Sequence, residues 1–350
     1  MLNTSLINDD QEIYFPEQHS KIDLVVGQFE VGKGPLIFLS TIEGLTENIG
    51  DELFPSKWKD GSYFIFKTNS LYFFCKCLLA SNISTSRGSL QVTYALISSS
   101  LIFDKYCDPI FQSIEQTIRS YDSVNFDSTQ ILATFQNSLS NLPIMSIRHP
   151  LSLFTDGSFV CSYFDNNPKL LLYLWKARLL GYKIAINSDN SLSEITNLTY
   201  FLSACSIFPN LTKSFYNDTF FHIALCASDK VNADWKLCYL THPILQESIQ
   251  ADIILNNRSD NYSISRDKKW IKKGDGSIID SIKDAIEKKN DKNLLFILLH
   301  LNHVLFNYLQ NTEFIDSNEI NSFGLNSMNK SFITQLVQTY HFNCVYNSCC

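Results

Sequence analysis

Residues 170–187 read LLLYLWKARLLGYKIAIN, and this stretch decides the fold of the middle of the chain. At about 3.6 residues per turn, its first part predicts a helix with an apolar stripe on one face and two cations, Lys176 and Arg178, on the other. The stripe consists of Leu170, Leu171, Leu174, Ala177 and Leu180. Gly181 can end this helix in a left-handed turn because it has no Cβ. The run 183–186 (KIAI) then predicts a short buried strand, so we expect an α/β layer here.

Composition and charge are typical of a globular protein. The 350 residues favour roughly two domains, and 45% hydrophobic against 18% charged residues argue against disorder. A net charge of −7 argues against a general nucleic-acid or anionic-membrane surface, which would need a basic excess. The one local basic cluster, 266–273 (RDKKWIKK), is short and predicts a solvated linker face. We therefore expect no nucleic-acid partner.

The 10 cysteines predict buried thiols rather than disulfides. The sequence MLNTSLINDDQEIYF at the N-terminus has neither the basic nor the apolar segment of a secretory signal, so we expect a cytoplasmic protein with reduced thiols. No Cys-x-x-Cys pair is present to hold zinc. The longest apolar run, 294–299, is far shorter than the ~20 residues of a membrane span.

Residues 22–31 (IDLVVGQFEV) and 36–40 (LIFLS) predict two strands joined by a tight turn at 32–35 (GKGP). The segment 27–34 (GQFEVGKG) also nearly spells the phosphate-binding loop G-x-x-x-x-G-K-[S/T]. However, Gly34 stands where a magnesium-binding hydroxyl is required, and the following residues read as a strand. A phosphate loop leads instead into a helix whose N-terminus holds the phosphates, so the hairpin is favoured over an NTPase.

Other apolar runs complete an antiparallel α+β unit in the first third of the chain. Strands are predicted at 63–66, 71–79 and 91–98, a helix from residue 102 onward, and a helix or loop at 126–142. The stripe of the helix is Tyr106, Ile110, Phe111, Ile114 and Ile118. Pro143 and the pair His149-Pro150 mark a boundary, because proline interrupts helices and ladders.

The rest of the chain predicts an α/β middle and a helical end. In the middle, a helix at 191–208 precedes strands at 222–226 and 235–240. Its stripe is Ile195, Leu198, Phe201, Leu202 and Cys205. Towards the end, helices are predicted at 277–289 with Ser277 as N-cap, at 294–310 and at 331–340, followed by a strand at 342–346.

No motif for side-chain chemistry rises above background. His300 and His303 share a helical face at i, i+3, which can hold a metal, but no acidic residue accompanies them and the run is otherwise apolar. We therefore predict two polar residues at the edge of a packed helix. The two Asp-Gly-Ser segments, 156–158 and 275–277, predict turns. We expect no catalytic residue, no cofactor and no metal, although a Ser/His/Asp set can be spread along a sequence without any local signal.

Several segments resemble the DENN family. The run 175–186 (WKARLLGYKIAI) is similar to the central DENN segment, an apolar helix, a turn with basic residues and a buried strand. The last third resembles the LCHN branch of that family in its strands, its long helix and its tail with a paired cysteine. These segments are 237–245, 251–255, 299–309, 323–333 and 344–350. Residues 59–64 and 90–101 fit the longin-like first lobe of the family.

The resemblance implies a fold of two lobes after a flexible tail at 1–20. A longin-like antiparallel sheet with helices would occupy 21–145, a central α/β DENN module 146–255, and a helical part 256–350. DENN proteins are exchange factors for Rab-type small GTPases in vesicle trafficking. They bind the nucleotide-free GTPase better than the GDP form and need no catalytic dyad. The implied partners are a Rab-type GTPase and, by resemblance, another longin or DENN-type subunit. The residues that touch the GTPase are unknown from the sequence.

Three functions therefore stay open at this point. The resemblance favours a Rab exchange factor, and a DENN-type scaffold that binds a GTPase or a partner subunit without exchange is the alternative. A P-loop hydrolase is the third. Cys349 and Cys350 are adjacent, and paired cysteines at such a position can carry lipid groups. Unmodified thiols are favoured over lipidation, and at most we expect peripheral association with vesicle or organelle membranes.

Overall fold

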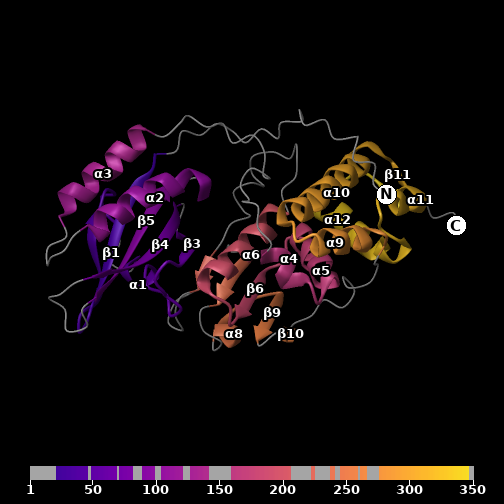
Figure 1. Cartoon of the computed structure of the whole chain (residues 1–350). Helices are drawn as coiled ribbons and strands as arrows, with labels where there is room; N and C mark the ends of the chain where they lie inside the picture. The colour runs from indigo at the N-terminus through magenta and orange to yellow at the C-terminus, as the bar shows by residue number, and fades with distance from the viewer. Residues whose placement is uncertain are drawn as a thin grey trace.

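The computed structural model describes residues 21–45, 49–68, 71–81, 89–98, 104–120, 127–141, 159–205, 222–224, 237–240, 245–258, 261–265 and 276–346. These residues form a mixed α/β structure with two five-stranded sheets and a small two-stranded one. In Figure 1 the antiparallel sheet and the helices α2 and α3 occupy the left half of the molecule, and the second sheet with the later helices occupies the right half. We call residues 21–141 the antiparallel lobe and residues 159–346 the α/β lobe.

The antiparallel sheet has the strand order β2-β1-β5-β4-β3. Its strands are β1 (Asp23–Glu30), β2 (Gly34–Ser40), β3 (Tyr63–Thr68), β4 (Leu71–Ser81) and β5 (Ser89–Ser98). The predicted hairpin and the three other predicted strands are confirmed, with a bulge between Val26 and Gly27 in the β1–β2 ladder. Gly34 begins a strand rather than a helix, which contradicts a phosphate loop at this position.

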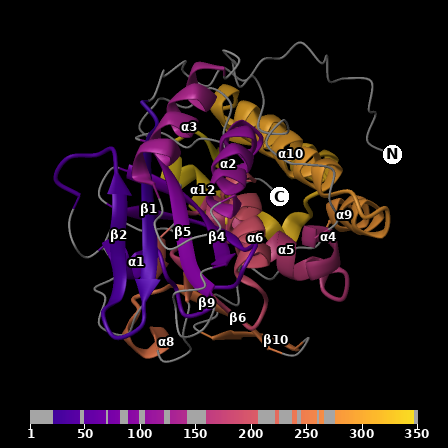
Figure 2. The same ribbon diagram turned by 60° about the vertical axis from the view of Figure 1, so that its left-hand side comes forward.

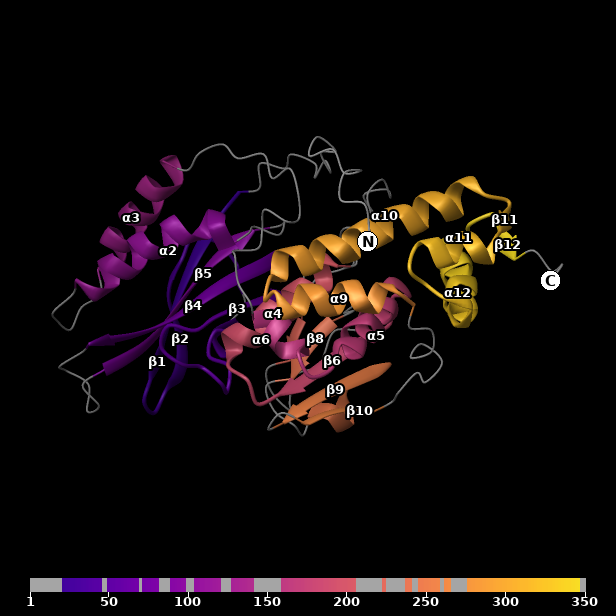
Figure 3. The ribbon, with the colours of Figure 1, turned by 45° about the vertical axis from the view of Figure 1, so that its right-hand side comes forward.

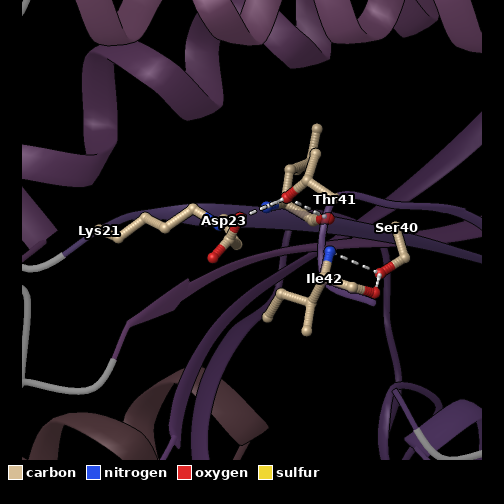
Figure 4. A network of polar contacts seen from close by, with 6 residues as sticks. Lys21, Asp23, Ser40, Thr41 and Ile42 are labelled. Atoms are coloured by element: carbon tan, nitrogen blue, oxygen red, sulfur yellow. Dashed lines mark hydrogen bonds and ion pairs between the residues drawn. The ribbon is translucent and has the colours of Figure 1, made fainter. Parts of the chain in front are cut away.

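Side chains at the end of the β1–β2 hairpin fix where the ladder stops (Figure 4). The hydroxyl of Thr41 donates to Asp23 Oδ1 at 2.9 Å and accepts from the amide of Leu24 at 2.8 Å. The hydroxyl of Ser40 donates to the carbonyl of Ile42 at 2.9 Å. These bonds satisfy main-chain groups that the neighbouring strand no longer reaches, so the chain leaves the sheet at a defined residue.

The two faces of the antiparallel sheet are buried against different partners. On one face, α2 (Asp104–Arg119) and α3 (Ser128–Ser140) cover an apolar cluster that includes Tyr94, Ile114 and Phe135, which confirms the helix predicted from residue 102. Figure 2 shows both helices lying over this sheet. The other face carries Phe64, Phe66 and Phe73 and belongs to one apolar cluster with the α/β lobe.

The stretch of sequence at 170–187 forms most of α5 (Pro168–Leu179) and β6 (Ile184–Ser188), as predicted, with Gly181 at a φ of +71° between them. The face opposite the predicted apolar stripe, which carries Lys176 and Arg178, is buried as well. Their exposed fractions are only 1% and 4%. The cause is α12 (Lys330–Tyr340), which packs on this face from more than a hundred residues away. The ammonium of Lys176 lies 5.6 Å from the centre of the Phe332 ring, and the Tyr340 hydroxyl donates to the carbonyl of Leu179 at 2.7 Å.

The second sheet has the order β10-β9-β6-β8-β7. Besides β6 it contains β7 (His222–Ala224), β8 (Leu237–Leu240), β9 (Ile253–Arg258) and β10 (Asn261–Ser265). All pairs are parallel except β9–β10, and β10 had no counterpart among the predicted strands. Beside this sheet lie α4 (Phe159–Phe164), α5 and α6 (Leu192–Ala204), and the short α8 (Leu245–Ser248) precedes β9. The predicted stripe of α6 is fully buried.

The C-terminal part is helical, as predicted. It contains α9 (Ile278–Glu287), α10 (Asp291–Asn311), α11 (Ser317–Ser322), the short turn η4 (Ser327–Asn329) and α12. Strands β11 (Phe314–Ile315) and β12 (Val345–Tyr346) pair at its far end (Figure 3). In Figures 1 and 3, α5 and α6 lie between the second sheet and the pair α9–α10. Ser277 precedes α9 as predicted, but its side chain makes no capping hydrogen bond.

Two buried polar side chains tie these helices together. Asn302 on α10 accepts from Trp175 Nε1 on α5 at 2.8 Å and donates to the carbonyl of Cys205, which ends α6, at 2.8 Å. Asp291, the first residue of α10, accepts from the amides of Val160 and Cys161 at 2.9 and 2.7 Å and so caps α4 from a distant part of the chain.

The turn before α9 requires glycine. A Cβ on Gly276 would lie 1.9 Å from the carbonyl oxygen of Gly324, and Gly324 itself has a φ of +84°. The same carbonyl accepts from the amide of Ile278 at 3.1 Å. Two main-chain segments therefore touch here without an intervening side chain.

Several expectations concern residues outside the described part: the tail 1–20, the boundary at 145, the basic cluster 266–273 and the pair Cys349-Cys350. The expected boundary after residue 255 falls inside β9, because β9 and β10 complete the second sheet before the helical part begins.

Candidate functional site

Parallel strands bring their carboxyl ends to one edge of a sheet, and open α/β sheets generally bind ligands there. In this protein β6 ends in Asn187-Ser188, and β9 carries Asn256-Asn257 directly before its last residue, Arg258. The neutral polar residues among these form a cluster. The side-chain amide of Asn187 donates to Asn256 Oδ1 at 3.0 Å, and Gln246 on α8 donates to the same oxygen. The carboxyl edge is therefore lined by side chains whose polar groups already bind one another.

The turn between β6 and α6 continues this cluster. Asn190 Oδ1 accepts from the Ser188 hydroxyl at 3.0 Å and from Asn257 Nδ2 at 3.3 Å. At the start of α6, the amide of Glu194 donates to the Ser191 hydroxyl at 3.3 Å, and the Ser191 amide donates to the Glu194 carboxylate at 2.9 Å. This capping box fills the helix N-terminus with the chain's own acidic group, so that N-terminus is not open to an anion.

Lys57 of the antiparallel lobe reaches into this edge. Its ammonium donates to the carbonyl of Ser188 and, at 3.4 Å, to the carbonyl of Asn190. It also lies 5.6 Å from the centre of the Tyr239 ring, within cation–π range. The neighbouring residue Trp58 positions Lys57, since its indole N–H donates to Thr93 on β5 at 2.8 Å. Burial lowers the pKa of the Lys57 ammonium, and the charge of Asp189 opposes that shift in part.

Tyr239 on β8 has a buried hydroxyl without a hydrogen-bond partner among the described residues. The residue is 2% exposed, and its ring supports Lys57. Burial, followed by the charge of Asp189, raises the pKa of the Tyr239 phenol. A buried hydroxyl without a partner is destabilising by about 1–3 kcal/mol.

A second polar contact joins the lobes beside Lys57. The amide of Tyr63 at the start of β3 donates to the Ser193 hydroxyl on α6 at 3.0 Å, and the Tyr63 hydroxyl donates to Asn197 Oδ1 one turn further along. Strand β3 also lies against β7, so edge strands of the two large sheets meet here. We call this set the interlobe seam; it consists of Lys57, Tyr63, Ser188, Asn190, Ser193, Asn197 and Tyr239.

The seam offers no nucleophile with an adjacent base. Its only charged member is Lys57, which is already bound to two carbonyls, and Asp189 beside it is exposed. What the seam can do is hold two lobes in one arrangement, so that side chains from both contribute to one outer surface.

The residues that the sequence pattern singled out do not meet at this seam. His300 and His303 lie on α10, and the His300 ring stacks on Phe296 with 6.5 Å between ring centres. Burial and the charge of His303 lower the pKa of the His300 imidazole. Among the described residues, no group of three or more His, Cys, Asp and Glu side chains is arranged to hold a metal ion.

Six cysteines whose side chains the structure describes behave as core residues, as predicted. Cys75, Cys77, Cys161, Cys205, Cys238 and Cys344 are buried free thiols. Burial raises the pKa of Cys77 and of Cys205 to about 12, so these thiols are protonated and unreactive at neutral pH.

The seam could not be predicted from the sequence, because its members come from four separate elements (β3, β6, α6 and β8) and from two connecting segments, and they have no common spacing. One signal was available. The pairs Asn187-Ser188 and Asn256-Asn257 directly follow short apolar runs in the sequence, and polar residues at strand ends often mark the edge of a parallel sheet where contacts are made.

No protein-family model matches this chain, and no curated protein is significantly similar to it. Within the described ranges, no helix is both long enough and apolar enough to cross a membrane.

Proposed function

We propose that this protein is an exchange factor that promotes GDP release from a Rab-type small GTPase. One observation carries the proposal: an antiparallel lobe and an α/β lobe with a helical end follow one another in a chain whose sequence resembles the LCHN branch of the DENN family. The resembling segments coincide with defined elements. They cover the end of α5 with β6, then β8, the start of β9, and much of α10.

The proposed mechanism rests on differential binding rather than on a catalytic side chain. A partner that binds the nucleotide-free GTPase more tightly than the GDP-bound form lowers the affinity of that GTPase for GDP by the same factor, because the two binding free energies are coupled. It acts as an exchange factor when this loss of affinity takes the form of faster GDP release. A surface that spans two lobes suits this task, since it can contact separate switch segments of a GTPase together. We propose that the outer rim of the interlobe seam forms part of this surface, and that the protein acts at a trafficking membrane as a peripheral partner.

The test is release of fluorescent GDP from a panel of purified Rab GTPases with and without the full chain. We expect at least about tenfold acceleration for one Rab, which corresponds to a barrier lowered by ~1.4 kcal/mol. Release driven by EDTA serves as the positive control, and circular dichroism verifies that the protein is folded. Binding to a nucleotide-free Rab without acceleration would instead support the scaffold. No binding to any member would refute the exchange factor and the GTPase-binding form of the scaffold.

A further inference from the structure

The two lobes share apolar contacts, but such contacts do not by themselves fix an orientation. Phe64, Phe66 and Phe73 of the antiparallel lobe belong to the same buried cluster as Leu192 and Ile195 of α6. Apolar burial is non-directional and roughly proportional to area, so it holds the lobes together without selecting one angle between them. Selection requires directional contacts across the boundary.

Lys57 contacts more groups across this boundary than a single hydrogen bond would. Within the described part of the chain its ammonium forms no ion pair; it is held by two main-chain carbonyls and by the face of the Tyr239 ring. The two carbonyls belong to one turn of the α/β lobe, and the ring belongs to one of its strands. The Lys57 ammonium can contact all three groups together only when the antiparallel lobe lies in one position relative to the α/β lobe. The Tyr63–Ser193 bond adds a second fixed point beside the first.

We propose that Lys57 is an orienting pin: it occupies the carboxyl edge of the second sheet as an internal cation and thereby sets the angle between the two lobes. This inference concerns the fold and stands whether or not the protein acts on a GTPase. Lys57 and Asn190 are partly exposed, so water can replace part of this contact, whereas Ser188 is only 1% exposed. Loss of the pin should therefore loosen the orientation and leave each lobe folded.

The test compares Lys57→Met with wild type in the full chain by hydrogen exchange. The reporter is the Tyr63 amide, which bonds across the seam. The references are the amides of Phe74 in β4 and Ile186 in β6, each on a strand that has a neighbour on both sides in its own sheet. We expect Tyr63 to exchange at least tenfold faster in the variant while both references keep their protection. Small-angle scattering should show a broader distribution of overall dimensions.

Two further variants make the test specific. Lys59→Met removes an exposed cation two residues away and should leave Tyr63 protection unchanged. Lys57→Arg keeps a cation at this position and should restore most of the protection. Unchanged exchange at Tyr63 in Lys57→Met would overturn the proposal, and so would equal loss at all three amides, which would indicate a general stabilising role. Lys57→Gln is prepared in parallel; failure of both neutral variants to fold would overturn it as well.

Discussion

Hydrogen bonds inside the α/β lobe and hydrogen bonds at the interlobe seam have similar lengths but different surroundings. Asn302 bonds Trp175 and Cys205 at 2.8 Å where Asn302 and Trp175 are 0% exposed. At the seam, Tyr63 bonds Ser193 at 3.0 Å, and both residues are half-buried. A group that loses its partner in the first region stays unpaired, whereas one at the seam can bind water. The same type of contact therefore secures stability in one place and orientation in the other.

The largest effect is expected at Asn302. Asn302→Ala leaves the Trp175 N–H and the Cys205 carbonyl without this partner and opens a cavity between α5, α6 and α10. We expect a loss of about 3–5 kcal/mol in the free energy of unfolding. Denaturant titration measures it, and Asn307→Ala on the exposed side of the same helix is the control, with less than about 0.5 kcal/mol expected. Similar losses in both variants would show that burial does not separate the two regions.

A substitution of Asp291 tests the buried region again, this time through hydrogen bonds from main-chain amides. Asp291→Ala removes the acceptor of two amides that begin α4, and Asp291 is only 5% exposed. The expected loss is about 2–3 kcal/mol. Asp284→Ala breaks an exposed ion pair with Lys288 and should lose less than about 0.5 kcal/mol. Equal thermal midpoints for the two variants would contradict this account of the α4 cap.

A substitution of Tyr239 at the seam should increase the free energy of unfolding, in contrast to the two substitutions above. Tyr239→Phe removes a buried hydroxyl that has no partner among the described residues and keeps the ring beneath Lys57. We expect a gain of about 1 kcal/mol in the free energy of unfolding. Tyr63→Phe removes a hydroxyl that does bond Asn197 and should be destabilising. A loss of stability in Tyr239→Phe would mean that its hydroxyl has a role in the folded protein that its contacts do not reveal.

Glu115 on α2 gives the smallest effect and extends the comparison to a partly exposed network. Burial tends to raise the pKa of its carboxyl, but hydrogen bonds and charges from Arg119 and Lys76 outweigh burial and lower it. A lowered folded pKa means that the stabilisation is present above the unfolded pKa of about 4.3 and is lost as pH falls through the folded value. The thermal midpoint should therefore decrease more steeply with falling pH, below about pH 5, in wild type than in Glu115→Gln. Parallel pH profiles would exclude this contribution.

Single helices and strands could be predicted from the sequence, but the distant segments that pack against them could not. The helix, glycine and strand in residues 168–188 follow from apolar spacing and one left-handed glycine, both of which are local properties. The burial of Lys176 and Arg178 depends on α12, which no spacing within α5 can reveal. The same holds for Lys57, which reads as one cation in a loop until the fold places the Ser188–Asn190 turn above it. β10 was missed because its alternation of polar residues is that of an exposed edge, not of a core strand.

The contact between Gly276 and Gly324 has a consequence for recognising distant relatives of this chain. Any side chain at 276 would collide with a main-chain oxygen at 1.9 Å, and a backbone atom cannot rotate away as a side chain can. A protein that diverged from this one can exchange almost every apolar residue for another of similar size and keep its fold. It cannot exchange this glycine without rerouting the chain. A glycine ahead of one amphipathic helix, matched by a second in the turn before the last helix, is therefore a signature that can outlast detectable sequence similarity.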